Sequence, residues 1–248
     1  MNLRPAPSWH LPRVFAHRCG GALTPENTLA GLRIAAAMGV GAVEFDVMLS
    51  ADGTPWLIHD ETLERTTNGT GRVCDSPDAV LVNLEAGSYR HRSFAGERLP
   101  TLEAAAKLCR ELGLMANVEI KPAAGFEAIT GEVVAQKILD LWQGAPLPLV
   151  SSFSHSALEA ARRVAPQLPL GYLWVCPPED WRVPFDALGA FSLHCAWDKL
   201  GDGVLEEARS RGIPVLCYTV NERSAATALF AGGVTSVFSD RIDLLHKL

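Results

Sequence analysis

Short apolar runs with the character of β-strands recur along the chain, and helical patterns separate most of them. A parallel strand pair needs a crossover of a dozen or more residues, usually a helix, so this alternation predicts a parallel sheet. Eight such strands in 248 residues fit a (β/α)8 TIM barrel, an α/β fold, and a doubly wound sheet is the lesser alternative. The predicted strands end near His17, Asp46, Lys121, Phe153, Val175, His194, Val220 and Asp240.

One part of the chain interrupts this alternation. The Asp52-Gly53 pair predicts a tight turn, so residues 56–58 are expected to fold back as an antiparallel partner of residues 42–49. Residues 61–100 are rich in turn-forming residues, and a long irregular stretch in a compact domain is usually an insertion or a lid. We therefore expect a single domain over residues 1–248, with a small insertion after the second strand and its hairpin.

Helix starts are predicted from residues whose side chains can accept a hydrogen bond from the first helical turn. The expected N-caps of three helices are Asn27, Thr101 and either Ser154 or Ser156. No helix is expected in the proline-rich segment around Trp181.

The strand predicted over residues 42–49 carries two acids on one face. Glu44 and Asp46 are two residues apart, so both carboxylates point the same way. Burying them on an otherwise apolar strand is costly unless a positive charge lies between them. Glu119, on the next parallel strand, adds a third acid. Because carboxylate oxygens suit Mg²⁺ or Ca²⁺ better than Zn²⁺, these residues predict a site for one divalent cation, Mg²⁺ or Ca²⁺.

Two basic residues at the same strand ends allow a simpler interpretation. Glu44 could pair with Arg18, and Glu119 with Lys121, as ion pairs at the rim of the barrel. Three acids on neighbouring strands against two basic residues favour the metal site over this alternative. An arginine can contact a phosphate through two nitrogen atoms, and a lysine adds a compact charge. Arg18 and Lys121 are therefore candidates for binding one phosphate group.

Histidines stand on either side of the first two acids in the sequence. His17 ends the first predicted strand, and His59 follows the hairpin strand. An imidazole with its usual pKa near ~6.5 can accept or donate a proton at neutral pH, so the two form a candidate acid/base pair. The residues themselves do not decide which is the acid. Asp60 could orient His59, but we interpret it as the start of the next turn.

Net charge and hydropathy argue against several classes of protein. The formal net charge of -6 argues against a nucleic-acid-binding protein, which is usually basic. Residues 1–13 lack the apolar segment of a signal peptide, and no apolar run approaches the length of about 18 residues that spans a membrane. Neither export nor stable membrane association is therefore expected. The 6 cysteines, scattered without CxxC spacing, are expected to be reduced thiols in the cytoplasm.

Together these groups supply the components of metal-assisted phosphodiester cleavage, with positive charge for the phosphate and histidines for proton transfer. In order and spacing they resemble the glycerophosphodiester phosphodiesterases, most closely the short cytosolic bacterial type. The resemblance extends from about residue 14 to residue 240. Its motifs include His17-Arg18-Cys19-Gly20-Gly21, Pro25-Glu26-Asn27-Thr28, Glu44-Phe45-Asp46, His59-Asp60, Leu63-Glu64-Arg65-Thr66 and Glu119-Ile120-Lys121.

The resemblance implies hydrolysis of glycerophosphodiesters, such as glycerophosphocholine and glycerophosphoethanolamine, to sn-glycerol 3-phosphate and an alcohol. A neighbouring glycerol hydroxyl would attack first, and water would open the resulting cyclic phosphate. We assign the role of base to His17 and that of acid to His59. The residues implied are the metal ligands Glu44, Asp46 and Glu119, the catalytic pair His17 and His59, and the phosphate-binding Arg18 and Lys121.

Two positions depart from the pattern of the family. Cys19 stands where the family usually has glycine, and Tyr218 stands where many members have tryptophan, but neither change removes a catalytic group. Two other functions compete with this one. The first is a barrel phosphodiesterase acting on lipid head groups, of the phospholipase or sphingomyelinase D kind, and the second is a non-catalytic metabolite-binding barrel. We expect a small-molecule glycerophosphodiester as the partner, with the head group and the oligomeric state undetermined.

Overall fold

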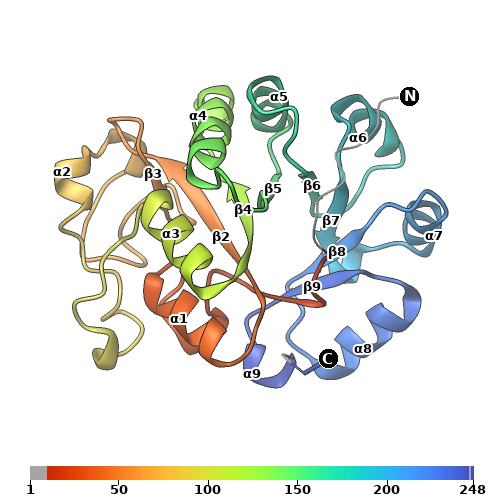
Figure 1. Ribbon diagram of the computed structural model, residues 1–248, viewed down its shortest axis with the longest axis horizontal. Helices are drawn as coiled ribbons and strands as arrows, with labels where there is room; N and C mark the ends of the chain where they lie inside the picture. Colours follow the sequence, from red (N-terminus) through yellow and green to blue (C-terminus); the bar gives the residue numbers. More distant parts are fainter. Residues whose placement is uncertain (1–9, 246) are drawn as a thin grey trace.

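A closed ring of parallel strands forms the centre of the protein (Figure 1). The computed structural model describes residues 10–245 and 247–248, and its strands are β1 (Val14–Ala16), β2 (Ala42–Leu49), β3 (Pro55–Leu57), β4 (Met115–Ile120), β5 (Leu149–Ser152), β6 (Leu170–Trp174), β7 (Ser192–Ala196), β8 (Val215–Tyr218) and β9 (Ser236–Ser239). Neighbouring strands follow the order β1-β9-β8-β7-β6-β5-β4-β2, and β1 also pairs with β2. These parallel strands therefore close on themselves, which confirms the predicted (β/α)8 barrel.

The predicted hairpin is also present. β3 pairs with β2 in antiparallel register, with Val47 opposite Leu57. The chain therefore folds back from the end of β2 that carries Asp46. The backbone N–H of Ile58 donates a hydrogen bond to the carbonyl oxygen of Asp46 at 3.1 Å, so the two segments stay together beyond β3. This contact brings His59 to the end of the acid-bearing strand.

Helices follow most strands and cover the outside of the ring (Figure 1). They are α1 (Leu29–Ala37), α3 (Leu102–Leu112), α4 (Glu127–Leu141), α5 (His155–Val164), α6 (Arg182–Leu188), α7 (Asp202–Ser210), α8 (Arg223–Gly232) and α9 (Ile242–Leu245), with short 3₁₀ turns η1 (Gly21–Leu23) and η4 (Trp197–Lys199). Thr101 and Ser154 cap α3 and α5 as predicted. The prediction for α1 was wrong, because Thr28 is its N-cap and the side chain of Asn27 binds Asp46 instead.

Helix α6, which begins directly after Trp181, was not expected from the sequence. Pro184 lies in its first turn, where the missing N–H removes no intrahelical hydrogen bond, so the proline is compatible with this helix. The following strand, β7, ends at Ala196, two residues beyond the predicted end at His194.

The alternation of side chains along the strands separates two cores. On β2, Val43, Phe45 and Val47 belong to the large core, whose other members lie on the helices and neighbouring strands. Ala42 instead packs with Phe15, Leu149, Leu216 and Phe238, which fill the interior of the barrel. Because successive side chains point to opposite faces, the two acids of β2 point into the barrel, beyond these apolar residues.

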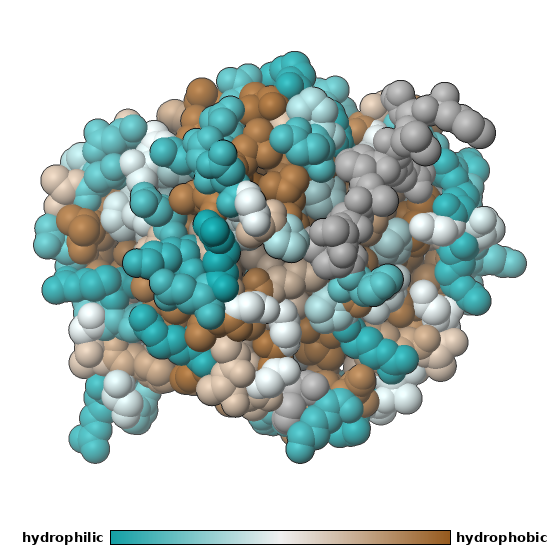
Figure 2. All heavy atoms as spheres, in the orientation of Figure 1, coloured by the Kyte–Doolittle hydropathy of each residue, from teal (hydrophilic) through white to brown (hydrophobic). Residues whose placement is uncertain are grey.

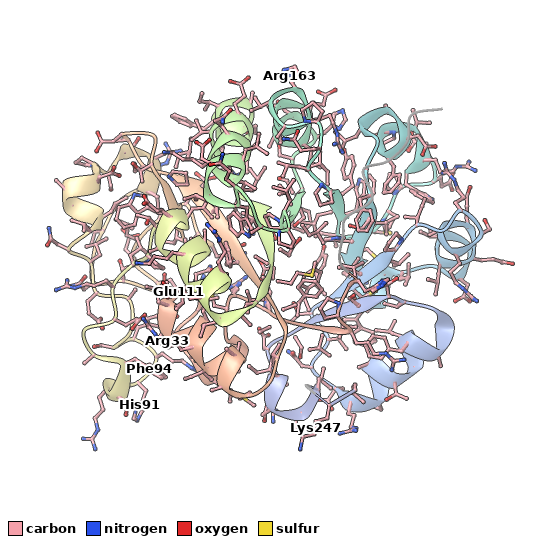
Figure 3. All side chains as sticks on the ribbon, viewed as in Figure 1. Arg33, His91, Phe94, Glu111, Arg163 and Lys247 are labelled. Atoms are coloured by element: carbon pink, nitrogen blue, oxygen red, sulfur yellow. The ribbon has the colours of Figure 1, made fainter. Side chains whose placement is uncertain are left out.

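Residues 61–100 contain short elements instead of a strand–helix repeat, namely η2 (Val73–Asp75), α2 (Asp78–Leu81) and η3 (Arg92–Phe94). Their apolar side chains pack on β3 and the end of β2 in a small separate core that includes Met48, Trp56, Ile58, Leu63, Val73, Leu81 and Leu84. The segment also contacts α1, since Glu97 accepts a hydrogen bond from the backbone N–H of Ala30. Figure 3 shows Phe94 and His91 on the side of the molecule where Arg33 of α1 lies.

Hydrophilic and apolar residues are interspersed over the face of the molecule seen in Figure 2. None of the described helices combines the length and the hydropathy needed to cross a bilayer. Residues 1–9, part of the segment for which no signal peptide is expected, lie outside the described residues.

Candidate active site

A cavity of about 280 Å³ opens at the carboxyl ends of the strands. This is the face on which TIM-barrel enzymes carry their active sites. Strands β2 and β4 and the segments after β1 and β3 each contribute charged or polar side chains to it. The structure brings together all the site residues selected from the sequence: His17, Arg18, Glu44, Asp46, His59, Glu119 and Lys121.

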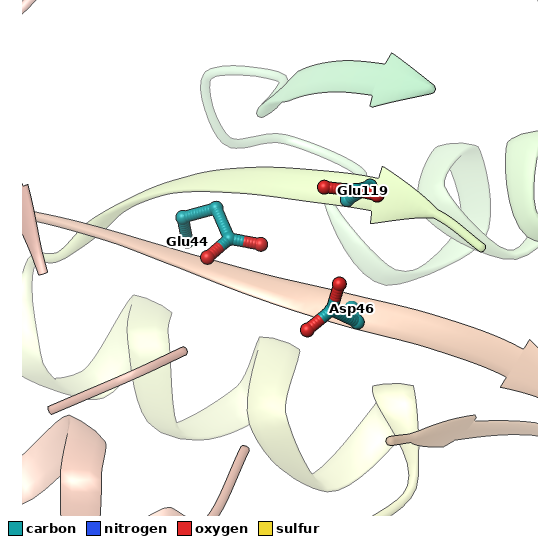
Figure 4. A group of neighbouring side chains, drawn as sticks. All are labelled: Glu44, Asp46 and Glu119. Atoms are coloured by element: carbon teal, nitrogen blue, oxygen red, sulfur yellow. The ribbon is translucent and has the colours of Figure 1, made fainter. Parts of the chain in front are cut away.

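Three carboxylates converge within this cavity (Figure 4). Glu44 and Asp46 from β2 and Glu119 from β4 each offer an oxygen, and these oxygens lie within 4.8 Å of one another. Their exposed fractions are 3%, 2% and 9%, so water screens the charges poorly. Burial and the nearby charge of Asp46 raise the pKa of Glu44 and raise the pKa of Glu119 to about 7. The three acids are therefore unfavourable as a cluster of negative charges unless a positive group joins them.

The donor set fits a divalent cation. Glu44 Oε2 accepts a hydrogen bond from the backbone N–H of Arg18 at 2.9 Å. The other oxygen, Oε1, is buried and has no hydrogen-bond partner among the described residues. A buried carboxylate oxygen without a partner is costly, and a cation would satisfy it. A set made only of oxygen donors suits Mg²⁺ or Ca²⁺ rather than Zn²⁺, which usually takes nitrogen or sulfur ligands.

Lys121 and Arg18 supply positive charge on two sides of Asp46. Lys121 Nζ lies 3.5 Å from Asp46 Oδ1, 3.3 Å from Glu119 Oε1 and 2.7 Å from His59 Nε2. Arg18 Nε lies 3.8 Å from Asp46 Oδ2 and has no hydrogen-bond partner among the described residues. Burial alone would raise the pKa of Asp46, but Lys121 and the other positive groups hold it below its usual value. The Nε–H of Arg18 is therefore a buried donor beside Asp46, unpartnered within the described part of the chain.

Both histidines are oriented by a carboxylate. His17 Nδ1 donates to Asp240 Oδ1 at 2.7 Å, and His59 Nδ1 donates to Asp60 Oδ1 at 2.7 Å. Each contact fixes the ring with Nε2 on the opposite edge, where Nε2 of His59 accepts a hydrogen bond from Lys121 Nζ. For His17 this edge faces the acids, since Nε2 lies 3.9 Å from Glu44 Oε2. The cavity therefore contains two imidazoles, each held at Nδ1 by a carboxylate.

Of the two orienting acids, Asp60 was considered for this role from the sequence but not chosen, and Asp240 was not predicted. Asp60 does lie in a bend after β3, but it also binds His59 and Arg65, so the preference for a turn over an orienting role was wrong. Asp240 follows β9 directly, and a polar residue at a strand end was the same signal that selected His17. That signal could have identified Asp240, although its partner is 223 residues away in the sequence.

The loop after β1 has an unusual backbone conformation. Arg18, Cys19 and Asn27 have φ values of 51°, 75° and 55°, in the left-handed region that residues other than glycine rarely adopt. Asn27 Nδ2 donates to Asp46 Oδ2 at 2.9 Å, and the backbone N–H of Asp46 donates to Asn27 Oδ1 at 3.1 Å. Backbone strain of this kind concentrates at functional sites, and here it holds an amide against one of the acids.

Comparison with known proteins decides the family. A sequence profile described as the Glycerophosphoryl diester phosphodiesterase family matches residues 17–244, nearly the whole chain. The chain belongs to the glycerophosphoryl diester phosphodiesterase family. A glycerophosphodiester phosphodiesterase of Caldanaerobacter subterraneus subsp. tengcongensis is 32% identical to it, over 95% of this chain and 96% of the relative. The resemblance and the enzyme class predicted from the sequence are therefore confirmed.

Solved structures of phosphodiesterases share the fold. An Oleispira antarctica phosphodiesterase, solved in complex with the product sn-glycerol-3-phosphate, has a TM-score of 0.90 and 35% sequence identity, with 96% of each chain covered. The glycerophosphodiester phosphodiesterase from Agrobacterium tumefaciens has a TM-score of 0.77 and 26% identity, with 96% of this chain and 100% of that chain covered.

One departure from the glycerophosphoryl diester phosphodiesterase pattern is accommodated by the core. Cys19 is fully buried in the large core, so its side chain does not enter the cavity. Its φ of 75° accounts for a glycine preference at this position. Gly31 makes room for the extra side chain, because a Cβ atom added there would lie only 2.8 Å from Cys19 Cβ.

The second departure from the family pattern lies in the wall of the cavity. Tyr218 and Phe153 both line it, with their rings in an edge-to-face contact at 5.8 Å. The Tyr218 hydroxyl donates to the carbonyl oxygen of Trp174 at 2.8 Å. The tyrosine therefore keeps an aromatic surface at this position and anchors it to β6.

Proposed function

We propose that this enzyme hydrolyses glycerophosphodiesters, such as glycerophosphocholine and glycerophosphoethanolamine, to sn-glycerol 3-phosphate and an alcohol. The observation that carries the proposal is that two carboxylate-oriented histidines share one cavity with three buried acids and two basic residues. The product bound in the Oleispira antarctica relative supports glycerol phosphate as the recognised part of the substrate. The partner would thus be a small molecule with a variable alcohol group.

One divalent cation, Mg²⁺ or Ca²⁺, would be held by Glu44, Asp46 and Glu119. The proximity of their oxygens and the unpartnered Oε1 of Glu44 support this assignment. When bound, the cation would supply positive charge to the phosphoryl oxygens and favour attack at phosphorus.

Arg18 and Lys121 would bind the phosphate group of the substrate. Both line the cavity, and the buried Nε–H of Arg18 lacks a partner. Fixed donors of this kind stabilise the negative charge that develops on the oxygens around phosphorus. An arginine would also orient the phosphate through paired contacts, whereas the lysine supplies a compact charge.

His17 and His59 would move the protons. His17 would take the proton of a neighbouring glycerol hydroxyl as its oxygen bonds to phosphorus. His59 would protonate the alcohol oxygen as its bond to phosphorus breaks, because an alkoxide is a poor leaving group. Water would then open the cyclic phosphate with the two roles exchanged. Lys121 Nζ donates to His59 Nε2 at 2.7 Å, so the group that would bind the phosphate and the group that would protonate the leaving alcohol are in direct contact.

We also propose that residues 1–248 act as one domain, in which residues 61–100 are an insertion that borders the cavity. Tyr89 supports the placement of this segment beside the cavity. Its hydroxyl accepts a hydrogen bond from the backbone N–H of Glu26 at 2.9 Å, in the loop that carries Arg18. A cytoplasmic location is proposed as well. It is supported by the cysteines, all six of which are free in the described part of the chain.

The proposed function is tested by supplying glycerophosphocholine with Mg²⁺ or Ca²⁺ and measuring glycerol 3-phosphate with a coupled dehydrogenase. Lysophosphatidylcholine in a parallel reaction tests the lipid head-group alternative. We expect release from glycerophosphocholine and much slower turnover of the lipid. A preference for the lipid would favour the alternative, and binding of glycerophosphodiesters without any release would favour a metabolite-binding barrel.

A further inference from the structure

A single arginine from the 61–100 segment lies between two acids at the edge of the cavity. Arg65 Nε and Nη2 donate to the two carboxylate oxygens of Asp60, at 2.5 and 3.0 Å. Its Nη1 and Nη2 donate to the two oxygens of Glu26, at 2.7 and 2.8 Å. The guanidinium therefore forms paired contacts on two sides, which fix its plane and the planes of both carboxylates.

Each of these two acids also accepts a hydrogen bond from a residue of the proposed reaction site. Asp60 Oδ1 accepts a hydrogen bond from His59 Nδ1 at 2.7 Å. Glu26 Oε1 accepts one from Arg18 Nη1 at 3.0 Å. An unbroken series of hydrogen bonds therefore runs from the imidazole of His59 through Arg65 to the guanidinium of Arg18.

We propose that Arg65 is a positioning residue that sets His59 and Arg18 relative to each other through Asp60 and Glu26. This inference rests on the proposed function, in which His59 moves a proton and Arg18 binds the phosphate. The histidine and the arginine come from different segments, and their shared connection is contributed by the segment proposed as an insertion. Its role would then be to align the site as well as to border it.

A role limited to fold stability does not account for this geometry. The Arg65 side chain is 45% exposed, and exposed ion pairs contribute only about 0–1 kcal/mol to stability. Neutralising Asp60 and Glu26 would require a nearby positive charge but not a planar group in a fixed orientation. A lysine at position 65 would therefore serve that purpose equally well. Four donor contacts to two carboxylates require a guanidinium.

The test compares Arg65→Lys and Arg65→Gln with the wild-type enzyme, using glycerophosphocholine turnover with metal supplied and sn-glycerol 3-phosphate affinity by calorimetry. Arg72→Gln is the matched control, because Arg72 lies in the same segment, is 41% exposed and pairs with Glu61 outside the cavity. We expect both Arg65 variants to lose about 10- to 100-fold in kcat/KM, the scale of a small misplacement of reacting groups. Product affinity should fall as well, while the thermal midpoint changes by no more than about 2–4 °C.

A double-mutant cycle identifies the route of the effect. If Arg65 acts through Glu26, then Arg65→Gln combined with Glu26→Gln should lose little more than the larger single variant. The inference is overturned if Arg65→Lys retains wild-type kcat/KM and product affinity. It is also overturned if the losses follow the fraction of unfolded protein or add fully in the cycle. A wild-type enzyme that releases no glycerol 3-phosphate would instead contradict the proposed function, and product affinity alone would then decide the role of Arg65.

Discussion

The ammonium nitrogen of Lys121 lies 2.7 Å from Nε2 of His59. An ammonium group can only donate, so Nε2 accepts, and the proton of the neutral imidazole sits on Nδ1 facing Asp60. The same ammonium lies 3.3 Å from Glu119, one of the three buried acids. The hairpin thus places His59 in contact with Lys121, which partly neutralises the acidic cluster. This contact links His59, one of the two proposed proton-transfer residues, to the predicted metal site.

The roles of the two histidines can be separated with a substrate whose leaving group needs no proton. Glycerophospho-4-nitrophenol releases an anion that is stable at neutral pH, so its cleavage does not require a general acid. We expect His59→Ala to lower turnover of glycerophosphocholine by about 100-fold or more but to lower nitrophenol release by less than about tenfold. His17→Ala should lower both rates alike. The opposite result would exchange the two assignments.

Asp240 should matter for catalysis although it does not line the cavity. The Asp240→Asn substitution removes the charge that holds His17 Nδ1, so the ring loses its fixed tautomer and orientation. We expect kcat for glycerophosphocholine to fall by about 100-fold, the lower end of what a positioned acid or base contributes. Asp243→Asn is the control, because Asp243 pairs with Arg241 at the surface. Equal rates for the two variants would contradict an orienting role for Asp240.

The central part of the site could be predicted because sequence periodicity determines it. Two acids at an interval of two on β2 must share a face, and the parallel neighbour β4 brings Glu119 beside Asp46 in register. The roles of Asp60 and Asp240 could not be predicted in this way. They depend on side-chain contacts made outside the strands, which no periodicity encodes.

Local rules failed where tertiary contacts compete with them. Asn27 is a good N-cap by residue type, but its side-chain amide makes two hydrogen bonds to Asp46 instead. Thr28 is therefore the N-cap of α1. The proline-rich composition around Trp181 suggested a loop, yet Pro184 occupies a helical position that tolerates it. In both cases the residue type was compatible with more than one position, and packing selected the one observed.

The barrel interior depends on a glycine opposite a buried histidine. A Cβ atom at Gly171 would lie 2.5 Å from Nε2 of His194, a ring that is fully buried. Gly171→Ala should therefore destabilise the protein by about 1–3 kcal/mol, measured by urea unfolding. Gly203→Ala in α7 is the control, because its Cβ would meet open space and alanine favours a helix. Equal stability of the two variants would mean that the barrel interior accommodates the added methyl group without loss of unfolding free energy.

His194 should also make stability depend on pH. Burial lowers the pKa of His194 from 6.5 to about 3, so the folded protein keeps this ring neutral where the unfolded chain would bind a proton. The stabilisation is fully present above pH 6.5 and is lost progressively as the pH falls toward 3. Between pH 7.5 and 5.0 we expect wild type to lose about 2 kcal/mol more than His194→Gln in urea unfolding. An identical loss in both proteins would show that another group is responsible.

The central claim is that Glu44, Asp46 and Glu119 hold a divalent cation that the reaction requires. The most direct measurement follows glycerol 3-phosphate release from glycerophosphocholine by metal-free enzyme as Mg²⁺ or Ca²⁺ is added. Cation binding to the same samples is measured by calorimetry, with Glu119→Gln in parallel. We predict no release after EDTA treatment, recovery at the cation concentration at which binding saturates, and at least about tenfold weaker binding by the variant. Release that survives EDTA at the wild-type rate, or unchanged cation binding by Glu119→Gln, would contradict this account.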